Sequence, residues 1–517
     1  MRKNIITNMQ NTENTEKKTM LLLLAIAVVF VLVDISLIFN DSVWCDEAFS
    51  LLQCRTSFTS FLNNVKSDAW PPFYAFISRF FSAIFGVSAP ALKIVSIIPA
   101  FLTMILGATV VYKQFKSRFI SIVFMFMTGC MPVSIHMNLE LRGYSWAMFF
   151  VTSCGLLAWL IYNSHNKKNR IIYYILYTVS AICGAYTHYY ALGAILIVSL
   201  LLFVFLIKQQ TKSIIPCAII SAVCIVSYIP WLRIFYHATK SVSKGYWIEP
   251  KSLGDFLRFF LYPFTMEFDN LGDIIDSPFC YIMTILAFML LIYMIISLFK
   301  KDIKKNERNQ IIYAILCASI MILVIGAGYV ISKLITPMFI SRYLTPSMGL
   351  FWLFLSMGAK IFIGNNKKML AFFAALILVM TAWGFTTQRT AELSTGTEEA
   401  KEIIRKKMRG SFTVILSDSD YLNWTEIEYY FPESTHYINC EDVKSITLEG
   451  NVSYLLYLAC DEFPRDDFIK LGYKIVDHGE YDFDSCYYFH LYEVKKKNRP
   501  QLIVSPRISN QNVERLR

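Results

Sequence analysis

Long apolar stretches dominate the first 390 residues of this 517-residue chain. An α-helix needs about 20 mostly apolar residues to cross the hydrocarbon core of a bilayer. About eleven stretches approach that length: 20–40, 91–112, 119–136, 144–162, 171–187, 189–207, 213–231, 279–299, 311–331, 345–363 and 368–386. Only 17% of the residues are charged, against roughly 25% in an average soluble domain. The sequence therefore predicts an α-helical polytopic membrane protein.

Basic residues are concentrated in short connections between these stretches. Lys or Arg occurs in the N-terminal tail and in the loops 113–118, 163–170, 208–212, 300–309 and 364–368. With eleven spans, all of these segments fall on one side of the membrane, and the positive-inside rule makes that side cytoplasmic. The orientation also accounts for the formal net charge of +11 without a nucleic-acid partner.

The predicted organisation has four parts. A cytoplasmic tail (1–19) precedes the transmembrane domain (20–386), whose first extracytoplasmic loop covers 41–90. A small extracytoplasmic α/β domain follows over 387–495, because a helical pattern alternates there with short β-rich runs such as FTVILS and VSYLLYLA. Residues 496–517 form a flexible basic tail. In an oxidising compartment, Cys45 and Cys54 can form a disulfide, as can a pair among Cys440, Cys460 and Cys486.

Polar and aromatic residues recur at the predicted outer ends of the spans. The first loop holds the adjacent carboxylates Asp46 and Glu47. Later in the same loop, Asp68 lies in the stretch SDAWPPFY, where two prolines stiffen the backbone. Other candidates lie at later span ends: Glu140, Arg142, Tyr144, His188, Arg342 and Tyr343. A helical bundle can gather all of these ends around one cavity.

Most of these residues also have a purely structural explanation. Tyrosines at span ends commonly anchor a protein at the membrane interface, and Arg342 can extend toward it. His188 can be a packed polar side chain. Asp34, inside the first span, is either functional or hydrogen-bonded to a neighbouring helix. The grouping of three carboxylate elements, two arginines and a histidine on one face favours a functional role.

These residue types suit a nucleophilic displacement on an activated substrate that a lipid carries. A carboxylate can accept the proton of an attacking hydroxyl group. The planar fork of an arginine matches the oxygens of a departing phosphate. Of two adjacent carboxylates, one can act as the base while the other holds the acceptor or a divalent cation.

The motifs in these positions resemble those of the polytopic GT-C glycosyltransferases of the protein-mannosyltransferase type, which is family 39 with its bacterial relatives, including the aminoarabinose transferases. The resemblance rests on DEAFS, DAWPPFY, ELRGYS, THYYA and RYLTP, and covers roughly residues 20–360. It implies a GT-C-like fold, a polyprenyl-phosphate-linked sugar as donor, and an inverting transfer on the extracytoplasmic face. A bacterial plasma membrane is the expected location.

The resemblance also implies roles for individual residues. Asp46 looks like the catalytic base, supported by Glu47, and Asp68 looks like the second acidic residue of the first loop. Glu140 and Arg142 look like the acidic–basic pair near the donor phosphate and the acceptor. Arg342 looks like an arginine on the phosphate side. The sequence lacks an obvious β-trefoil-like domain between spans, and this departure disfavours a protein Ser/Thr acceptor.

Other functions compete with this interpretation. A transporter or flippase of lipid-linked glycans is expected to show inverted repeats and ionisable groups near the membrane midplane, whereas the charges here lie at one edge. A polysaccharide polymerase or ligase would share the outer-face chemistry without the first-loop motifs. The sequence thus favours a glycosyltransferase whose acceptor is a cell-surface glycan, a lipid or a protein.

Overall fold

The computed structural model describes residues 2–68, 70–209, 214–242, 248–267, 274–300, 303–364, 366–393, 396–408, 413–416, 423–432, 436–439, 452–458, 463–482 and 488–496. These residues form two compact units, and each is described by itself below. The bundle unit comprises Met1–Ile38, Lys66–Ile77 and Lys93–Arg389. The mixed unit comprises Phe39–Val65, Ser78–Leu92 and the described residues of Thr390–Arg517. Cys440, Cys460, Cys486 and residues 497–517 lie outside the described ranges.

The described part of the chain is mainly helical up to residue 393. The first elements are α1 (Arg2–Ile35), α2 (Cys45–Arg55), α3 (Phe58–Ser67), α4 (Phe73–Phe85), α5 (Ala89–Leu106), the π-helical η1 (Gly107–Val111), α6 (Tyr112–Phe115), α7 (Arg118–Cys130) and α8 (Pro132–Leu139). The following elements are α9 (Tyr144–Asn163), α10 (Lys167–Ala185), α11 (Tyr189–Lys208), α12 (Ile214–Val242), α13 (Leu253–Arg258), the 3₁₀ helix η2 (Phe259–Phe264) and α14 (Pro278–Ser297). The last are α15 (Lys305–Leu334), the 3₁₀ helix η3 (Ser341–Leu344), α16 (Thr345–Ile363) and α17 (Lys367–Glu392).

The membrane-spanning character of the bundle unit agrees with the prediction from sequence. Among the described residues, nine helices are long and apolar enough to cross a membrane, and a tenth is obtained if the bent pair α7 and α8 counts as one span. The two halves of that pair meet at an angle of 56°. Pro132 at the start of α8 has no backbone N–H to continue α7, which explains the break. The remaining predicted span lies on α10, whose first turn carries Lys167, Lys168 and Arg170 and lowers its apolarity.

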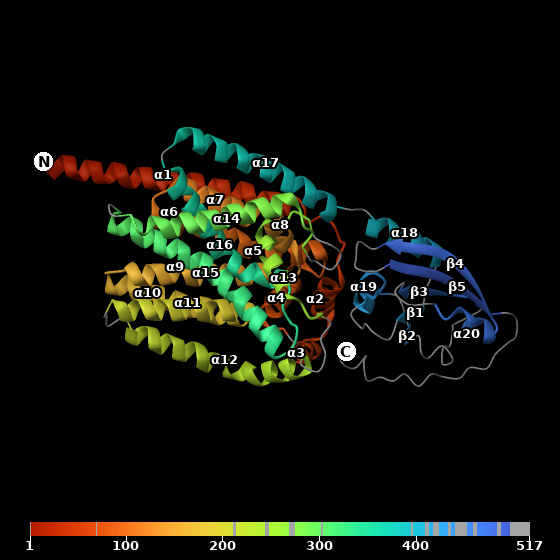
Figure 1. The fold of residues 1–517 in the computed structure, drawn as a ribbon. Coiled ribbons are helices and arrows are strands. Elements are labelled where there is room, and N and C mark those ends of the chain that lie inside the picture. Colours follow the sequence, from red (N-terminus) through yellow and green to blue (C-terminus); the bar gives the residue numbers. More distant parts are fainter. Residues whose placement is uncertain are drawn as a thin grey trace. The chain divides into compact units, whose positions relative to one another are not determined.

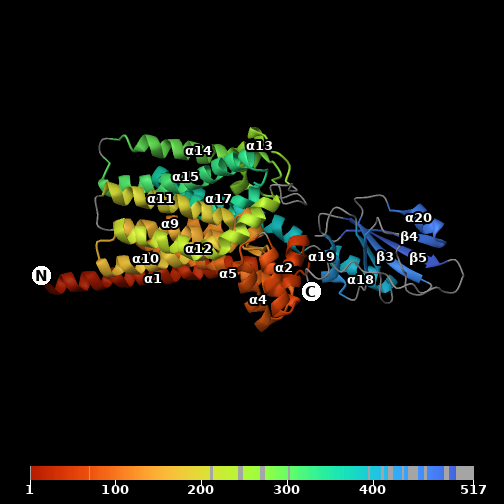
Figure 2. The ribbon, with the colours of Figure 1, turned by 90° about the horizontal axis from the view of Figure 1, so that it is seen from below.

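The ends of the helices separate by charge. In both views, the C-terminal ends of α9, α11 and α14 lie at the same end of the bundle as the start of α1 (Figures 1 and 2). The ends of α6 and α16 lie at that end in Figure 1. These are the helices that precede the predicted basic connections. The described residues that begin these connections therefore share one end of the bundle.

Close contact between α9 and α16 depends on two glycines. A Cβ atom at Gly349 of α16 would collide with Thr152 of α9, and one at Gly155 of α9 would collide with Leu350 of α16. Small residues allow membrane helices to approach each other in this way. Because α9 begins just after Arg142 and α16 begins just after Arg342, this contact also sets the positions of the two arginine-bearing segments.

The mixed unit contains a five-stranded sheet with helices from two distant parts of the chain. Its later elements are α18 (Gly396–Met408), β1 (Thr413–Leu416), α19 (Asn423–Tyr430), β2 (His436–Asn439), β3 (Val452–Leu458), α20 (Arg465–Lys470), β4 (Tyr473–Asp482) and β5 (Tyr488–Lys496). The strand order is β2-β1-β3-β5-β4, in which β1 pairs in parallel with β2 and β3 and the other pairs are antiparallel. The small α/β domain predicted from the sequence is therefore present.

Aromatic and aliphatic side chains of β3, α20, β4 and β5 form the core of this sheet region. The buried members are Leu455, Tyr457, Phe468, Tyr473, Ile475, Tyr492 and Val494. Phe463 packs against them, with its ring stacked 4.0 Å from that of Tyr492. The mixed unit also contains α2, so the residues after the first span belong with the C-terminal part of the chain. Its Cys45 and Cys54 are buried free thiols rather than a disulfide.

The Gly349→Ala substitution tests the α9–α16 contact. The added methyl group must push against Thr152, so we expect a loss of about 1–3 kcal/mol in the free energy of unfolding, as for other overpacked sites. Thermal unfolding in detergent would measure this effect. Gly326→Ala on the exposed face of α15 is the matched control, because nothing lies within 4 Å of its added Cβ atom. Equal stability of the two variants would refute the contact.

Candidate functional site

The structure assigns the predicted site residues to both units. Asp46 and Glu47 lie in the mixed unit, in the first turn of α2. The other seven belong to the bundle unit: Asp68, Glu140, Arg142, Tyr144, His188, Arg342 and Tyr343. They occupy the connections that lead into α4, α9, α11 and α16. These connections lie at the end of the bundle opposite to the start of α1 (Figure 2).

An aromatic cluster joins four of these connections around the Trp70 side chain. The indole centroid lies 5.0 Å from the ring of His188, 5.8 Å from that of Tyr343 and 6.5 Å from that of Tyr144. His188 is also 5.3 Å from Tyr144 and 5.4 Å from Tyr343. Trp70 was not among the predicted site residues. Its place in DAWPPFY, two residues after Asp68, was the available signal.

Backbone geometry explains how Trp70 is held in this position. The carboxylate Oδ1 of Asp68 accepts a hydrogen bond of 3.2 Å from the backbone N–H of Trp70. The two prolines that follow restrict the chain before α4 begins. The guanidinium carbon of Arg142 lies 5.0 Å from the centre of the indole ring. This is a cation–π arrangement, which is strongest when the pair is shielded from water.

His188 is neutral at physiological pH in this environment. Its side chain is only 2% exposed, and its Nδ1 accepts a hydrogen bond of 3.1 Å from the backbone N–H of Tyr190, which caps α11. Burial, followed by the positive charges of Arg142 and Arg342, lowers the pKa of His188 to about 3. Because Nδ1 accepts, the proton of the neutral ring is on Nε2. Nε2 is buried and has no hydrogen-bond partner among the described residues.

Arg142 and Arg342 therefore approach the same imidazole from different elements. Arg142 lies in the connection between α8 and α9, and Arg342 lies in η3. Both side chains are buried. The charge of each disfavours protonation of His188. Arg142 lies against the indole that is 5.0 Å from His188, and Arg342 adjoins Tyr343, whose ring is 5.4 Å from His188. The arrangement can bind an anion with several charge-assisted hydrogen bonds.

Glu140 and Tyr262 lie near the same arginine. Burial is the main reason why the pKa of Tyr262 is raised, and the carboxylate of Glu140 raises it further while Arg342 opposes this effect. The Tyr262 hydroxyl is 2.8 Å from that of Thr345, at the start of α16. Tyr262 was not among the predicted site residues. Its helix η2 carries no motif and follows a long stretch without other candidates.

The carboxylates of α2 differ in their surroundings. Asp46 is half-buried, whereas Glu47 is buried. The Oε2 atom of Glu47 accepts a hydrogen bond of 3.3 Å from the backbone N–H of Trp44, just before the helix. This contact resembles one half of a capping box. It gives Glu47 a role at the helix start.

Two further sequence expectations concern Asp34 and a divalent cation. Asp34 is buried within α1, and its Oδ2 accepts a hydrogen bond of 3.0 Å from Asn138 of α8. This contact matches the structural explanation for Asp34. Within the described ranges, no group of three or more His, Cys, Asp or Glu residues is arranged to hold a metal ion.

Comparison with known proteins identifies similar structures. Two structures of ArnT from Cupriavidus metallidurans, one bound to undecaprenyl phosphate and one in the apo state, match with TM-scores of 0.47 and 0.46. In both comparisons the identity is 10%, and the match covers 93% of this chain and 99% of the other. No protein-family model and no curated protein matches the sequence. The function must therefore be argued from the residues of this chain.

The protonation state of His188 provides a test of the site's electrostatics. We expect its imidazole to stay neutral from pH 8 down to about pH 4, as measured by the ¹⁵N chemical shifts of labelled histidine. The unfolded chain binds this proton near pH 6.5 and the folded chain only near pH 3. The contribution of His188 to stability is therefore lost as the pH falls through this window. Protonation of His188 near pH 6.5 in the folded protein would contradict the assignment.

Proposed function

We propose that this chain is a membrane glycosyltransferase that transfers a sugar from a polyprenyl phosphate to an acceptor hydroxyl. The observation that carries the proposal is the approach of two buried guanidinium groups, from Arg142 and Arg342, to the neutral His188. Guanidinium groups from two different elements can offer several charge-assisted hydrogen bonds to the oxygens of one bound phosphate. The Nε2–H group of His188 supplies a further donor to the same anion.

The location of this region favours a phosphate that is attached to a lipid. Arg142 lies two residues before the span that begins at Tyr144, and Arg342 is the second residue of another span, of 23 residues. The anion-binding groups are therefore at the ends of membrane-spanning helices. A polyprenyl carrier can place its phosphate there while its apolar chain remains in the bilayer. A free, water-soluble sugar nucleotide would gain nothing from this position.

The proposed reaction is a single displacement at the anomeric carbon. The acceptor oxygen forms the new glycosidic bond, and the bond between the anomeric carbon and the phosphate oxygen breaks. The electron pair of that bond remains on the polyprenyl phosphate, where Arg142 and Arg342 stabilise the charge. The acceptor proton passes to a carboxylate, which we assign to Asp46 from its place in the DEAFS motif. The configuration at the anomeric carbon is inverted.

The remaining assignments follow the same proposal. Glu140 orients the acceptor, and Asp68 orients the first loop. Tyr144 and Tyr343 line the site together with Trp70. The transfer is placed on the extracytoplasmic face of a bacterial plasma membrane, with the N-terminus in the cytoplasm. The acceptor class is a cell-surface glycan, a lipid or a protein, and the sugar is a hexose or a pentose.

Removal of the charge at Arg342 should reduce transfer severely. We expect Arg342→Gln to lower kcat about 10²- to 10³-fold, as loss of an electrostatic donor does elsewhere. The measurement uses full-length protein in proteoliposomes with a panel of undecaprenyl-phosphate sugars and candidate acceptors. Arg308→Gln is the control, because Arg308 is exposed in the first turn of α15. Wild-type turnover in the Arg342 variant would contradict a phosphate-side role.

The Asp46→Asn variant separates chemistry from donor binding. We expect transfer to fall by about 10²- to 10⁴-fold, because an amide cannot accept the acceptor's proton. Binding of the undecaprenyl-phosphate sugar, measured by quenching of tryptophan fluorescence, should stay within twofold of the wild type. If the variant translocated the lipid-linked sugar and the wild type formed no glycosidic product, a flippase would be the better explanation.

A further inference from the structure

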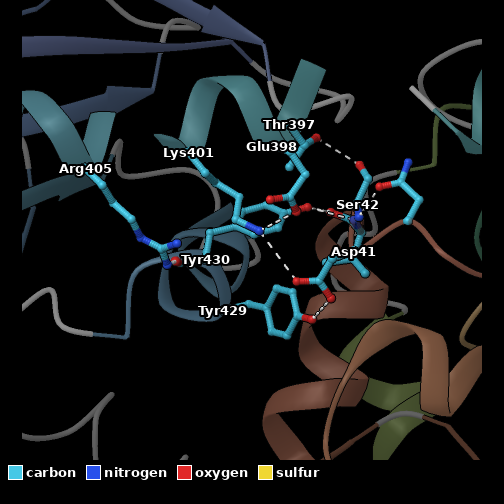
Figure 3. Close-up of polar contacts among 10 residues, drawn as sticks. Asp41, Ser42, Thr397, Glu398, Lys401, Arg405, Tyr429 and Tyr430 are labelled. Atoms are coloured by element: carbon cyan, nitrogen blue, oxygen red, sulfur yellow. Dashed lines mark hydrogen bonds and ion pairs between the residues drawn. The ribbon is translucent and has the colours of Figure 1, made fainter. Parts of the chain in front are cut away.

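Ten residues lie between the end of α1 at Ile35 and the acidic pair that begins at Asp46. Helices more than 350 residues later in the sequence form hydrogen bonds with four of these ten residues. Asp41, Ser42, Val43 and Cys45 each accept or donate a hydrogen bond with a side chain of α18 or α19. All of these residues belong to the mixed unit. Figure 3 shows α18 and α19 approaching this segment from the C-terminal part of the chain. Asp46 follows directly after the last of these tethered positions.

The hydroxyl of Tyr430 makes the central contact. It accepts a hydrogen bond of 2.7 Å from the backbone N–H of Val43 and donates one of 2.9 Å to the backbone C=O of the same residue. Tyr430 and Val43 are each 2% exposed, so water does not compete for these groups. The Tyr430 hydroxyl thus satisfies both the N–H and the C=O group of Val43, which would otherwise be buried without a partner. This fixes the chain three residues before Asp46.

Contacts on either side of Val43 reinforce the same geometry. On the C-terminal side, the hydroxyl of Thr425 donates a hydrogen bond of 3.1 Å to the backbone C=O of Cys45, the first residue of α2. On the N-terminal side, the hydroxyl of Ser42 lies 2.9 Å from that of Thr397. Thr425 and Thr397 are fully buried. The start of α2 is therefore tied to two different helices.

A small charged network completes the attachment at Asp41 (Figure 3). The Tyr429 hydroxyl donates a hydrogen bond of 2.6 Å to Asp41 Oδ1, and the ammonium group of Lys401 lies 3.5 Å from Oδ2. Lys401 also pairs with Glu398 at 2.7 Å and lies over the ring of Tyr430, 5.0 Å from its centre. The Lys401 side chain is 6% exposed, whereas those of Asp41 and Glu398 are 38% and 52% exposed, so solvent reaches the carboxylate side of both ion pairs.

We propose that Tyr430, supported by Thr425 and the Asp41–Lys401 pair, is a positioning residue for the carboxylate of Asp46. The inference rests on the proposed function, in which Asp46 is the base. A base must be held within about 0.5 Å of its productive geometry, and a misplacement of 1 Å can cost 10²-fold in rate. The hydrogen bonds of Tyr430 set where α2 begins, and Asp46 is the second residue of that helix. The C-terminal helices would then act on the rate of the chemical step without touching the substrate.

Tyr430→Phe is the direct test, because it removes the hydroxyl and keeps the ring. In full-length reconstituted protein, we expect kcat to fall about tenfold while the KM for the donor stays within twofold. Hydrogen–deuterium exchange of the amides of residues 43–50 should become faster. Tyr481→Phe is the matched control. This variant also loses a hydroxyl contact within the mixed unit, the hydrogen bond of 2.7 Å that the Tyr481 hydroxyl accepts from Lys407. Because Tyr481 makes no hydrogen bond with the described residues 41–47, kcat should not change.

The outcomes separate this inference from the proposed function. If the wild type transfers sugar and Tyr430→Phe keeps its full kcat, the positioning role is wrong and the proposed function stands. If no donor supports transfer by the wild type, the proposed function fails and the positioning role fails with it. A parallel loss of kcat and donor binding would indicate a merely structural role. Should Tyr430→Phe not fold, Thr425→Val takes its place, with the same expected change in kcat and unchanged KM.

Discussion

Two buried guanidinium groups at one end of a membrane bundle are the constraint on which the rest of the site depends. Arg142 and Arg342 carry like charges into a region from which water is largely excluded, and the free energy of this arrangement depends on what surrounds them. Protonation of His188 would add a third positive charge, so the imidazole stays neutral and presents an N–H group. The guanidinium group of Arg142 lies over the indole ring of Trp70, which stabilises it by a cation–π interaction.

The helix packing below this region maintains the constraint. The two arginines precede α9 and α16, and these helices touch through Gly155 and Gly349. Any change in that contact is transmitted to the connections that hold the guanidinium groups, because both arginines lie within three residues of a helix start. The hydrogen bond between Tyr262 and Thr345 attaches η2 to the start of α16. Packing that looks purely structural therefore determines the electrostatics of the site.

Much of this fold could be predicted from the sequence, because apolar length and loop charge are local properties. Glu140, Arg142, His188 and Arg342 could be named as candidates because they lie at span ends in short motifs, and their functional role stays a prediction. Trp70 and Tyr262 were missed because their importance arises from neighbours far away in the sequence. The apolar pattern of residues 119–136 does not reveal the bend between α7 and α8, although Pro132 marks its position. Protonation states such as that of His188 depend on burial, which a sequence does not contain.

The first loop and the C-terminal residues belong to one unit, which could not be predicted from the sequence because they lie about 300 residues or more apart. This grouping constrains the topology. The hydrogen bonds between Val43 and Tyr430 require both residues to lie on the same side of the membrane. One follows the first span and the other follows the last, so the number of spans must be odd. Within the described ranges, nine apolar helices and the bent pair make ten spans. Counting α10 as well gives eleven, which satisfies the requirement.

The separation of 387 residues between Val43 and Tyr430 also has a consequence for biogenesis. At a synthesis rate of roughly 5–20 residues per second, the chain that must follow Val43 takes roughly 20 to 80 s to emerge from the ribosome. During that time the first loop has been synthesised, but α18 and α19, which form hydrogen bonds with it, have not. The acidic pair can therefore acquire its final position only after every span has been inserted, so an incompletely assembled chain would be held inactive.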